Sequence, residues 1–296
     1  MTTFHSTSEI FQGQACHRLT LPCGDTALIA EQGAHVLSWV SQGRERLYLS
    51  PDNLWDGRSA IRGGVPVCFP QFNQRGTLPR HGFARNMNWR IDDAAQVGEA
   101  VASGDAAHIA FTLSTNPDTL AIWQQAFVAV LRVALAPGQL TITLTVNNTE
   151  VKNALHFTGA LHTYLAVDDI DLTELRGLGG SAEWDAVADV HGVADEALYF
   201  DGEFDRVYTR IESASAKALQ LQDGSGTLHI EQSPSWANSV VWNPGEGQCA
   251  ALADMPAHDF ARMLCVEAAQ VFEPISIPAG GQWIGWQRFT VSSCRC

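Results

Sequence analysis

The alternation of apolar and polar residues between positions 127 and 148 is the feature that most restricts how this chain can fold. In FVAVLRVAL, at positions 127–135, Phe, Ala, Leu, Val and Leu occupy every second position. In QLTITLTVNN, at 139–148, aliphatic residues alternate with threonine. Side chains on a strand point alternately to opposite faces, so this spacing predicts two strands that each bury one face. The Pro137-Gly138 pair between them is a turn signal, and we expect an antiparallel hairpin.

Similar short apolar runs recur along the chain and are separated mostly by Gly, Pro, Asn or Asp. They cover residues 26–30, 35–40, 108–114, 154–167, 218–223, 227–232, 238–243, 263–268 and 283–291. Many short strands with few amphipathic helices predict an all-β protein, an antiparallel sandwich or barrel. Such domains run well past the usual length of about 150 residues. We therefore expect one domain over residues 1–296.

Composition limits the partners and the compartment. The chain has 18 Lys and Arg against 32 Asp and Glu, a net charge of −14, which disfavours binding to nucleic acid or to an anionic membrane. No apolar run approaches the roughly 18 residues of a membrane span, and the first residues lack the pattern of a signal peptide. Seven cysteines without framework spacing predict free thiols. We expect a cytoplasmic protein.

Two stretches lack clean periodicity. Residues 51–86 combine Pro, Gly and Arg with Trp55, Phe69, Phe72 and Phe83, too many aromatic residues for a disordered segment. Long irregular segments within a compact domain are usually functional, so we interpret this one as a packed, site-forming loop region. Residues 177–203 are acidic and rich in Gly and Ala, which indicates a surface excursion between strands.

The irregular region contains candidate anion-binding residues. His81 lies between Arg80 and Arg85 and is followed by glycine, and Arg62 precedes two glycines. Glycines let backbone N–H groups turn toward an anion, and a guanidinium can bind phosphate through two hydrogen bonds. The alternatives are an ordinary loop histidine beside surface arginines, and a simple turn at Arg62.

Glu267 is the most informative single residue, because it lies inside the apolar strand MLCVEAA. A buried carboxylate needs a partner or a function, and burial raises its pKa toward that of a general base. The alternative is a solvated glutamate on an edge strand.

His156 and His162 are six residues apart, so on one regular strand both point to the same face. A metal site would need a closer ligand set, so we expect no metal and interpret His162 as a general acid. A core histidine is the alternative. Asp205 is a candidate for binding sugar hydroxyls, unless it pairs with the adjacent Arg206. No Gly-x-Ser-x-Gly, Walker, dinucleotide or His-Glu-x-x-His motif is present.

Several segments, taken in order, resemble the hexose-6-phosphate mutarotases, a branch of the aldose 1-epimerase superfamily. They are GAHVLSW at 33–39, IRGGVP at 61–66, CFPQF at 68–72, LPRHGFAR at 78–85, ALHTY at 160–164, DRVY at 205–208, VWNP at 241–244 and CVE at 265–267. The resemblance extends through most of the chain. It implies a galactose-mutarotase-like antiparallel β-supersandwich with few short helices and no cofactor.

The resemblance also implies roles for individual residues. Glu267 would be the general base and His162 the general acid. His81 and Asp205 would hold sugar hydroxyls, with Gln71 a further substrate-binding residue. Arg62 and Arg85 would bind the phosphate. Arg80 departs from the expected pattern, since a glutamine is expected before the His-Gly pair.

The expected activity is isomerisation, in which acid–base ring opening and reclosure interconvert the α and β anomers of a hexose 6-phosphate. A base and an acid on the two sides of the hemiacetal suffice for this reaction. The expected partner is a small sugar phosphate, and the expected state is a monomer or weak homodimer. Two alternatives stay open: an aldose 1-epimerase that acts on free sugars, and a non-catalytic carbohydrate-binding sandwich whose tryptophans stack on sugars.

Overall fold

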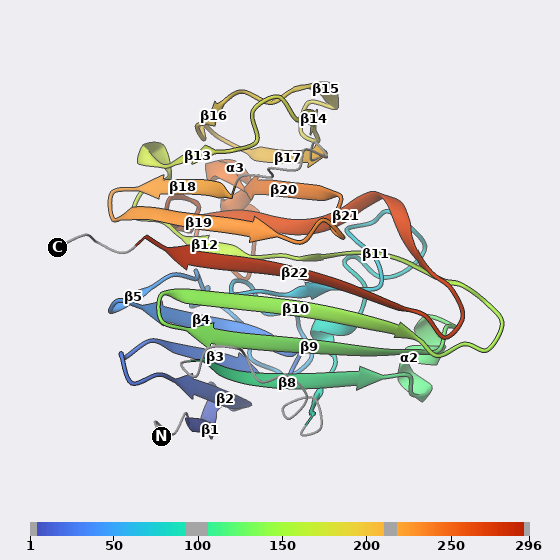
Figure 1. Ribbon diagram of the computed structural model, residues 1–296. Coiled ribbons are helices and arrows are strands. Elements are labelled where there is room, and N and C mark those ends of the chain that lie inside the picture. The colour runs from blue at the N-terminus through green and yellow to red at the C-terminus, as the bar shows by residue number, and fades with distance from the viewer. Residues whose placement is uncertain (1–4, 93–105, 210–217, 293–296) are drawn as a thin grey trace.

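Strands make up most of the regular structure and form three sheets of antiparallel strands, which confirms the all-β prediction (Figure 1). The computed structural model describes residues 5–92, 106–209 and 218–292. The five-stranded sheet consists, in spatial order, of β1 (His5–Phe11), β2 (Gln14–Thr20), β3 (Thr26–Ala30), β4 (His35–Ser41) and β5 (Arg44–Glu45).

The other two sheets are larger. The nine-stranded sheet consists, in order, of β16 (Ala197–Leu198), β13 (Glu174–Arg176), β18 (Leu219–Asp223), β19 (Gly226–Gln232), β22 (Gln282–Val291), β10 (Gln139–Asn148), β9 (Phe127–Ala136), β8 (Ala107–Ser114) and β7 (Arg90–Ile91). The eight-stranded sheet consists of β15 (Val190–Val193), β14 (Ala182–Asp185), β17 (Phe204–Thr209), β20 (Asn238–Asn243), β21 (Met263–Ile277), β11 (Leu155–Leu161) and β6 (Val67–Cys68), with β12 (Tyr164–Ala166) also paired to β21.

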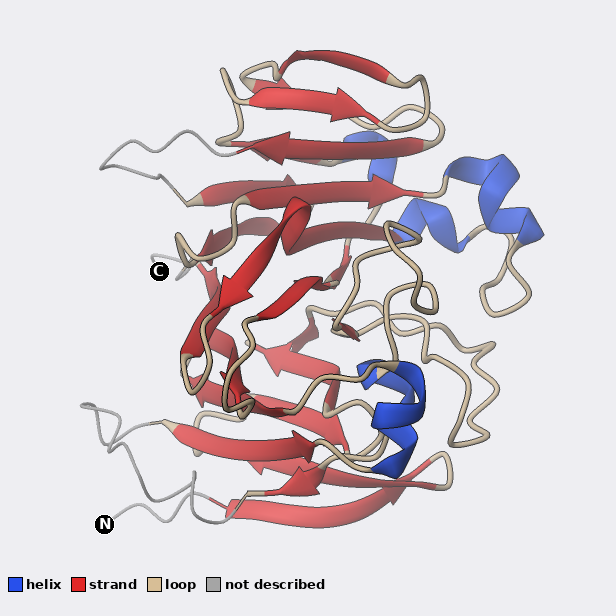
Figure 2. Cartoon of the chain, turned by 90° about the vertical axis from the view of Figure 1, so that its right-hand side faces the viewer, coloured by secondary structure: helices blue, strands red, loops and turns tan. Residues whose placement is uncertain are grey.

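Helices are short and few in the described ranges. The α-helices are α2 (Pro117–Ile122) and α3 (Gly245–Ala251), and the 3-10 helices are η1 (Ala84–Asn86), η2 (Ile170–Leu172) and η3 (Asp259–Arg262). Seen from the side, the helices and the longer loops gather along one edge of the stacked strands (Figure 2). No helix in the described part of the chain is long and apolar enough to cross a membrane.

The expected hairpin forms between β9 and β10. Their register pairs Leu131 with Leu144 and Val133 with Ile142, and both strands alternate strictly between buried and partly exposed residues. Gly138 turns the chain with a φ of 70°. Figure 1 shows these strands beside β8, β22 and β19 in the same sheet.

The main hydrophobic core is built by residues of all three sheets, for example Trp39 of β4, Leu131 of β9 and Val266 of β21. Strand β21 is unusual because its first nine residues are all buried, on both faces. Leu264, Val266 and Ala268 belong to the main core, while the residues between them face the other way. This arrangement buries Glu267 within a strand that is packed on both sides.

The pairing of β21 with β11 is interrupted between Phe157 and Gly159. Phe157 is opposite Ile275, whereas Gly159 is opposite Gln270, so β21 carries extra residues at 271–274. Beyond this interruption the His156 side chain is exposed, whereas His162 is buried. The two rings therefore lie in different surroundings.

The two irregular stretches behave differently. Residues 51–86 contain only β6 and η1 as regular elements in sheets or helices, and Phe69, Phe72 and Phe83 are buried, so this region is packed as expected. Residues 177–203 were expected to be a surface excursion, but they include β14, β15 and β16, two of which extend the eight-stranded sheet. Five cysteines in the described ranges are free thiols; Cys294 and Cys296 lie outside them.

Candidate active site

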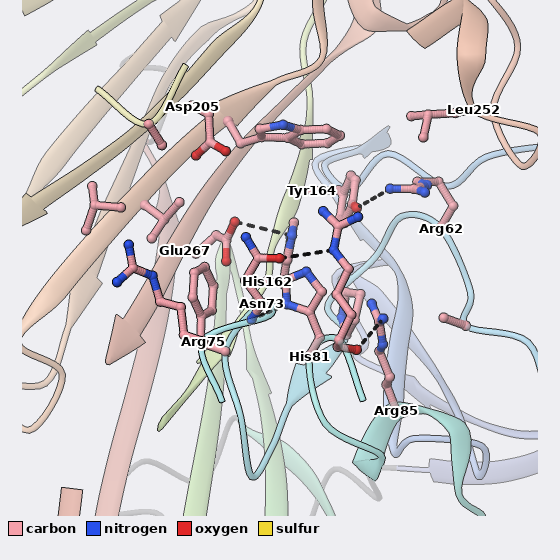
Figure 3. A pocket seen from close by; sticks show the side chains of 18 of the residues that line it. Arg62, Asn73, Arg75, His81, Arg85, His162, Tyr164, Asp205, Leu252 and Glu267 are labelled. Atoms are coloured by element: carbon pink, nitrogen blue, oxygen red, sulfur yellow. Dashed lines mark hydrogen bonds and ion pairs between the residues drawn. The ribbon is translucent and has the colours of Figure 1, made fainter. Parts of the chain in front are cut away.

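A cavity of about 330 Å³ opens beside the eight-stranded sheet and falls in the size range of small-molecule sites (Figure 3). Six of the seven residues expected to form the site line it. They are Arg62, His81, Arg85, His162, Asp205 and Glu267. They come from the 51–86 region, the end of β11, β17 and β21, which lie far apart in the sequence.

Strand register explains how neighbouring strands of the eight-stranded sheet bring lining residues together in the cavity. Val207 of β17 pairs with Val240 of β20, which pairs with Glu267 of β21. Two residues further along the same face, Asp205 pairs with Trp242. Leu161 pairs with Ala268, so His162 directly follows at the end of β11, beside Glu267.

Glu267 and His162, the expected base and acid, lie in direct contact in the cavity. Glu267 Oε1 lies 3.3 Å from His162 Nε2. Burial raises the pKa of Glu267 well above its usual value, and Asp205 adds to this effect. Burial, followed by the charges of Arg85 and Arg62, lowers the pKa of His162 to about 3. Both directions favour a neutral pair that shares one proton.

Each member of this pair also has a buried atom without a hydrogen-bond partner. These atoms are Oε2 of Glu267 and Nδ1 of His162. Buried polar atoms are normally paired, and unpaired ones are typical of sites that complete their hydrogen bonds with a ligand or water. A carboxyl and an imidazole that share a proton can accept a proton at one atom and release one at another.

His81 is held in a strained backbone conformation, with a φ of 63°. Its Nδ1 accepts the backbone N–H of Asn73 at 3.3 Å and contacts Cys68 Sγ at 3.1 Å. The proton of the neutral ring is therefore on Nε2, which makes that nitrogen a hydrogen-bond donor. The ring packs edge-on against that of His162, with 5.4 Å between centroids.

Arg62 is fixed by two partners, Asp254 in the loop after α3 and Tyr164 in β12. Its Nε and Nη2 donate to the carboxylate of Asp254, at 2.9–3.2 Å, and its Nη1 donates to the hydroxyl of Tyr164 at 3.1 Å. The Tyr164 ring in turn stacks on His162, with an interplanar angle of 11° and centroids 4.9 Å apart. Asp254 follows α3, so the loop after this helix holds one wall of the cavity.

Three other arginines line the cavity without a carboxylate partner. Arg85 donates to the backbone carbonyl of Arg80 at 3.1 Å, and Arg80 donates to Oδ1 of Asn73 at 3.1 Å. Arg75 packs on the ring of Trp184, with its guanidinium carbon 4.6 Å from the ring centroid. Across the described residues, none of these three guanidinium groups forms an ion pair.

Asp205 does not pair with Arg206, the alternative that the sequence left open. Arg206 instead contacts Glu183 at 3.2 Å and Asp185 at 3.4 Å. Burial, with a contribution from Glu203, raises the pKa of Asp205 to about 6. The Asp205 carboxyl faces the cavity, where Figure 3 shows it on the same side of His162 as Glu267.

Gln71 lies outside the cavity lining. Its side-chain amide binds the backbone of its own loop, with bonds to the carbonyls of Asn73 and Leu78 and from the N–H of Leu78. It holds the loop that carries His81. His156 also lies outside, and no group of three or more His, Cys, Asp or Glu side chains in the described ranges could hold a metal ion.

Several lining residues were not found from the sequence. Asp254, Trp184 and Arg75 belong to segments without any motif, and only the folded chain brings them to the cavity. Tyr164 and Trp242 were part of recognised segments but had no role attached to them.

Comparison with known proteins shows the family of this chain. The aldose 1-epimerase family matches residues 16–290. The chain belongs to the aldose 1-epimerase family. It is 33% identical to a protein of Cenchrus ciliaris over 86% of this chain and 77% of that protein. It is 34% identical to one of Escherichia coli strain K12 over 83% of this chain and 80% of that protein. Both carry the name "Putative glucose-6-phosphate 1-epimerase".

Two solved structures show the same fold. The crystal structure of a "putative mutarotase" from Salmonella typhimurium has a TM-score of 0.84 at 27% identity, covering 97% of this chain and 93% of that one. A galactose mutarotase-like protein from Clostridium acetobutylicum has a TM-score of 0.72 at 14% identity, covering 98% of both chains. The expected galactose-mutarotase-like supersandwich is confirmed, and the protein is an isomerase of the mutarotase type.

Proposed function

We propose that this mutarotase acts on a hexose 6-phosphate, with glucose 6-phosphate as the first candidate. The observation that carries the proposal is the charge of the cavity: Arg75, Arg80 and Arg85 line it without an ion-pair partner among the described residues, in a chain of net charge −14. An acidic protein that keeps uncompensated cations in one cavity is suited to an anionic ligand. The names of the two relatives from Cenchrus ciliaris and Escherichia coli agree with this substrate.

The orientation of the substrate follows from the two ends of the cavity. Figure 3 shows Arg62 and Arg85 on one side of His162, and Glu267, Asp205 and Arg75 on the other. The 6-phosphate binds at the arginine end, which leaves the anomeric carbon beside the Glu267–His162 pair. The hydroxyls of the sugar ring bind to Nε2 of His81 and to the carboxylate of Asp205.

Ring opening requires Glu267 as a carboxylate and His162 as a protonated imidazole, which is the charged form of the pair. The Glu267 carboxylate takes the proton of the anomeric hydroxyl, while protonated His162 gives a proton to the ring oxygen. The bond between C1 and the ring oxygen breaks, and its electron pair stays on that oxygen as C1 becomes an aldehyde. After rotation about C1–C2, the same two transfers in reverse close the ring on the other face of C1.

A mutarotase for free sugars is the second candidate function. The Glu267–His162 pair serves it equally well, but it gives no reason for three unpaired arginines in the cavity. One experiment separates the two: exchange between the anomers is measured by NMR for glucose 6-phosphate and for glucose, with and without protein. Faster catalysed exchange of the phosphorylated sugar supports the proposal, and equal or faster exchange of glucose contradicts it.

A further inference from the structure

The arginine end of the cavity and the catalytic pair are close enough to influence each other electrostatically. Tyr164 connects them, because its hydroxyl binds Arg62 and its ring stacks on His162. His162 is also surrounded by the rings of His81 and Trp242 and by the carboxyl of Glu267. His162 is buried, so solvent screens its imidazole less than it screens the exposed Arg80.

Figure 3 shows Arg62 and Arg85 on the His162 side of the pair, away from Glu267, so their charges act more strongly on the imidazole. Burial is the largest cause of the lowered pKa of His162, and Arg85, Arg62 and Arg80 lower it further, whereas the raised pKa of Glu267 comes from burial and from Asp205. Without a bound anion, burial and the positive charges together therefore keep the shared proton on Glu267. This is the unproductive form of the pair, because Glu267 cannot take a proton and His162 cannot give one.

We propose that a dianionic oxyanion bound between Arg62, Arg80 and Arg85 switches the Glu267–His162 pair into its charged, working form, so that the phosphate of the substrate activates catalysis as well as anchoring the sugar. This inference rests on the proposed hexose 6-phosphate specificity and extends it. The negative charge offsets that of the arginines. The proton then moves from Oε1 of Glu267 to Nε2 of His162, over the 3.3 Å between them.

Only a proton has to move for this switch. One proton leaves the carboxyl and arrives on the imidazole, so the total charge of the pair stays zero. An opposite charge near an ionisable group typically shifts its pKa by about one to three units. The working form of the pair should therefore become roughly ten- to a thousandfold more populated when the dianion binds.

The test supplies the sugar and the anion as separate molecules. Anomer exchange of free glucose is measured by NMR with increasing phosphite, at a pH where phosphite is a dianion and with chloride at equal ionic strength as the reference. The protein-free rate at each phosphite concentration is subtracted. We expect phosphite to raise kcat/KM for glucose saturably, by about tenfold or more, and to compete with glucose 6-phosphate.

Two variants distinguish the switch from a merely structural role of the arginines. In Arg85→Ala and in Arg80→Gln, activation by phosphite should be weakened, and the phosphite-free rate on glucose should rise above that of wild type. A structural defect would lower that rate instead. The matched control is Arg90→Ala, an exposed arginine on β7 outside the cavity, which should keep the full activation.

The outcomes separate this inference from the proposed function. If wild type prefers glucose 6-phosphate but phosphite leaves glucose exchange unchanged, whether or not it competes, the switch is wrong and the substrate stands. Equal activation in Arg85→Ala and wild type also overturns the switch. If wild type shows no preference for glucose 6-phosphate over glucose, the proposed substrate fails and the switch fails with it.

Discussion

Asp254 binds Arg62 through both carboxylate oxygens, across 192 residues of chain. This ion pair fixes the direction of one guanidinium at the cavity wall and leaves one of its nitrogens, Nη1, on Tyr164. It also places a carboxylate beside the proposed phosphate position, and Arg62 is the ion-pair partner of this carboxylate within the described residues. The two residues should therefore be energetically coupled.

Removal of Arg62 alone should be worse than removal of the pair. In Arg62→Ala the unpaired Asp254 carboxylate repels a phosphate, and a lost hydrogen bond to a charged group removes about 1.5–3 kcal/mol. We expect kcat/KM for glucose 6-phosphate to fall roughly a hundredfold or more, at about 1.4 kcal/mol per decade. Arg62→Ala/Asp254→Ala should recover part of that loss in a double-mutant cycle. Additive losses would show that the two side chains do not act together.

The proposed base and acid should each be essential for turnover but dispensable for folding. Removing a positioned acid or base lowers the rate by about 10²–10⁴. We expect Glu267→Gln and His162→Asn to lose kcat within that range in NMR exchange, with unchanged thermal unfolding. His156→Asn, an exposed histidine outside the cavity, is the control and should retain wild-type turnover. Near-normal exchange in a folded Glu267→Gln protein would eliminate this carboxyl as the base.

Asp205 should make stability depend on pH. Its pKa is raised to about 6, so the folded protein holds this proton more tightly than the unfolded chain. Ionisation therefore destabilises the fold as pH rises from the unfolded pKa, about 3.9, through 6. We expect Asp205→Asn to be more stable than wild type at pH 7.5, with the difference disappearing as pH falls to about 4. Chemical denaturation at several pH values measures this, and Asp201→Asn at an exposed site should show no such trend.

Gly82 should be required for the fold of the His81 loop. A Cβ at this position would overlap the carbonyl oxygen of Phe69, which also accepts the N–H groups of Phe83 and Ala84. Gly43 has a similar φ, 74° against 71°, but open space around it. Gly43→Ala should lose about 1–2 kcal/mol of unfolding free energy from backbone strain, and Gly82→Ala should lose substantially more. Equal losses in chemical denaturation would mean that the loop adjusts to the extra methyl group.

Trp184 should support substrate binding through Arg75. An exposed cation–π contact contributes about 0.5–1 kcal/mol. Trp184→Ala should therefore raise KM for glucose 6-phosphate about two- to fivefold, at about 1.4 kcal/mol per decade, with little change in kcat. Trp286→Ala removes a comparable contact with Arg288, 4.9 Å from the ring centroid and away from the cavity, and should leave KM unchanged.

The strands were predictable because their signals are local. The hairpin of β9 and β10 follows from alternation and one Pro-Gly turn, and every other predicted apolar run contains or overlaps a strand. Family membership was predictable because ordered segments such as 61–66 and 78–85 are themselves short and contiguous. The predicted catalytic and phosphate-binding roles remain predictions that the experiments above test.

What the sequence did not reveal depends on contacts between distant segments. Asp254 has no motif, and its importance comes only from its approach to Arg62. His156 is exposed and His162 is buried, and the register shift in the pairing of β11 with β21 lies between them; neither feature is visible in the spacing of the two histidines. The strands within 177–203 are short and partly exposed, so they carry little apolar periodicity.

The burial of β21 on both faces has an evolutionary consequence. Leu264, Val266 and Ala268 serve the core, and Glu267 between them serves the cavity. Selection for folding and selection for turnover therefore act on adjacent residues of one strand. Few substitutions in this strand preserve both properties. In a saturation library scored for both cellular abundance and anomer exchange, variants at the three core positions should lose abundance, whereas conservative variants at 267 should stay abundant and inactive.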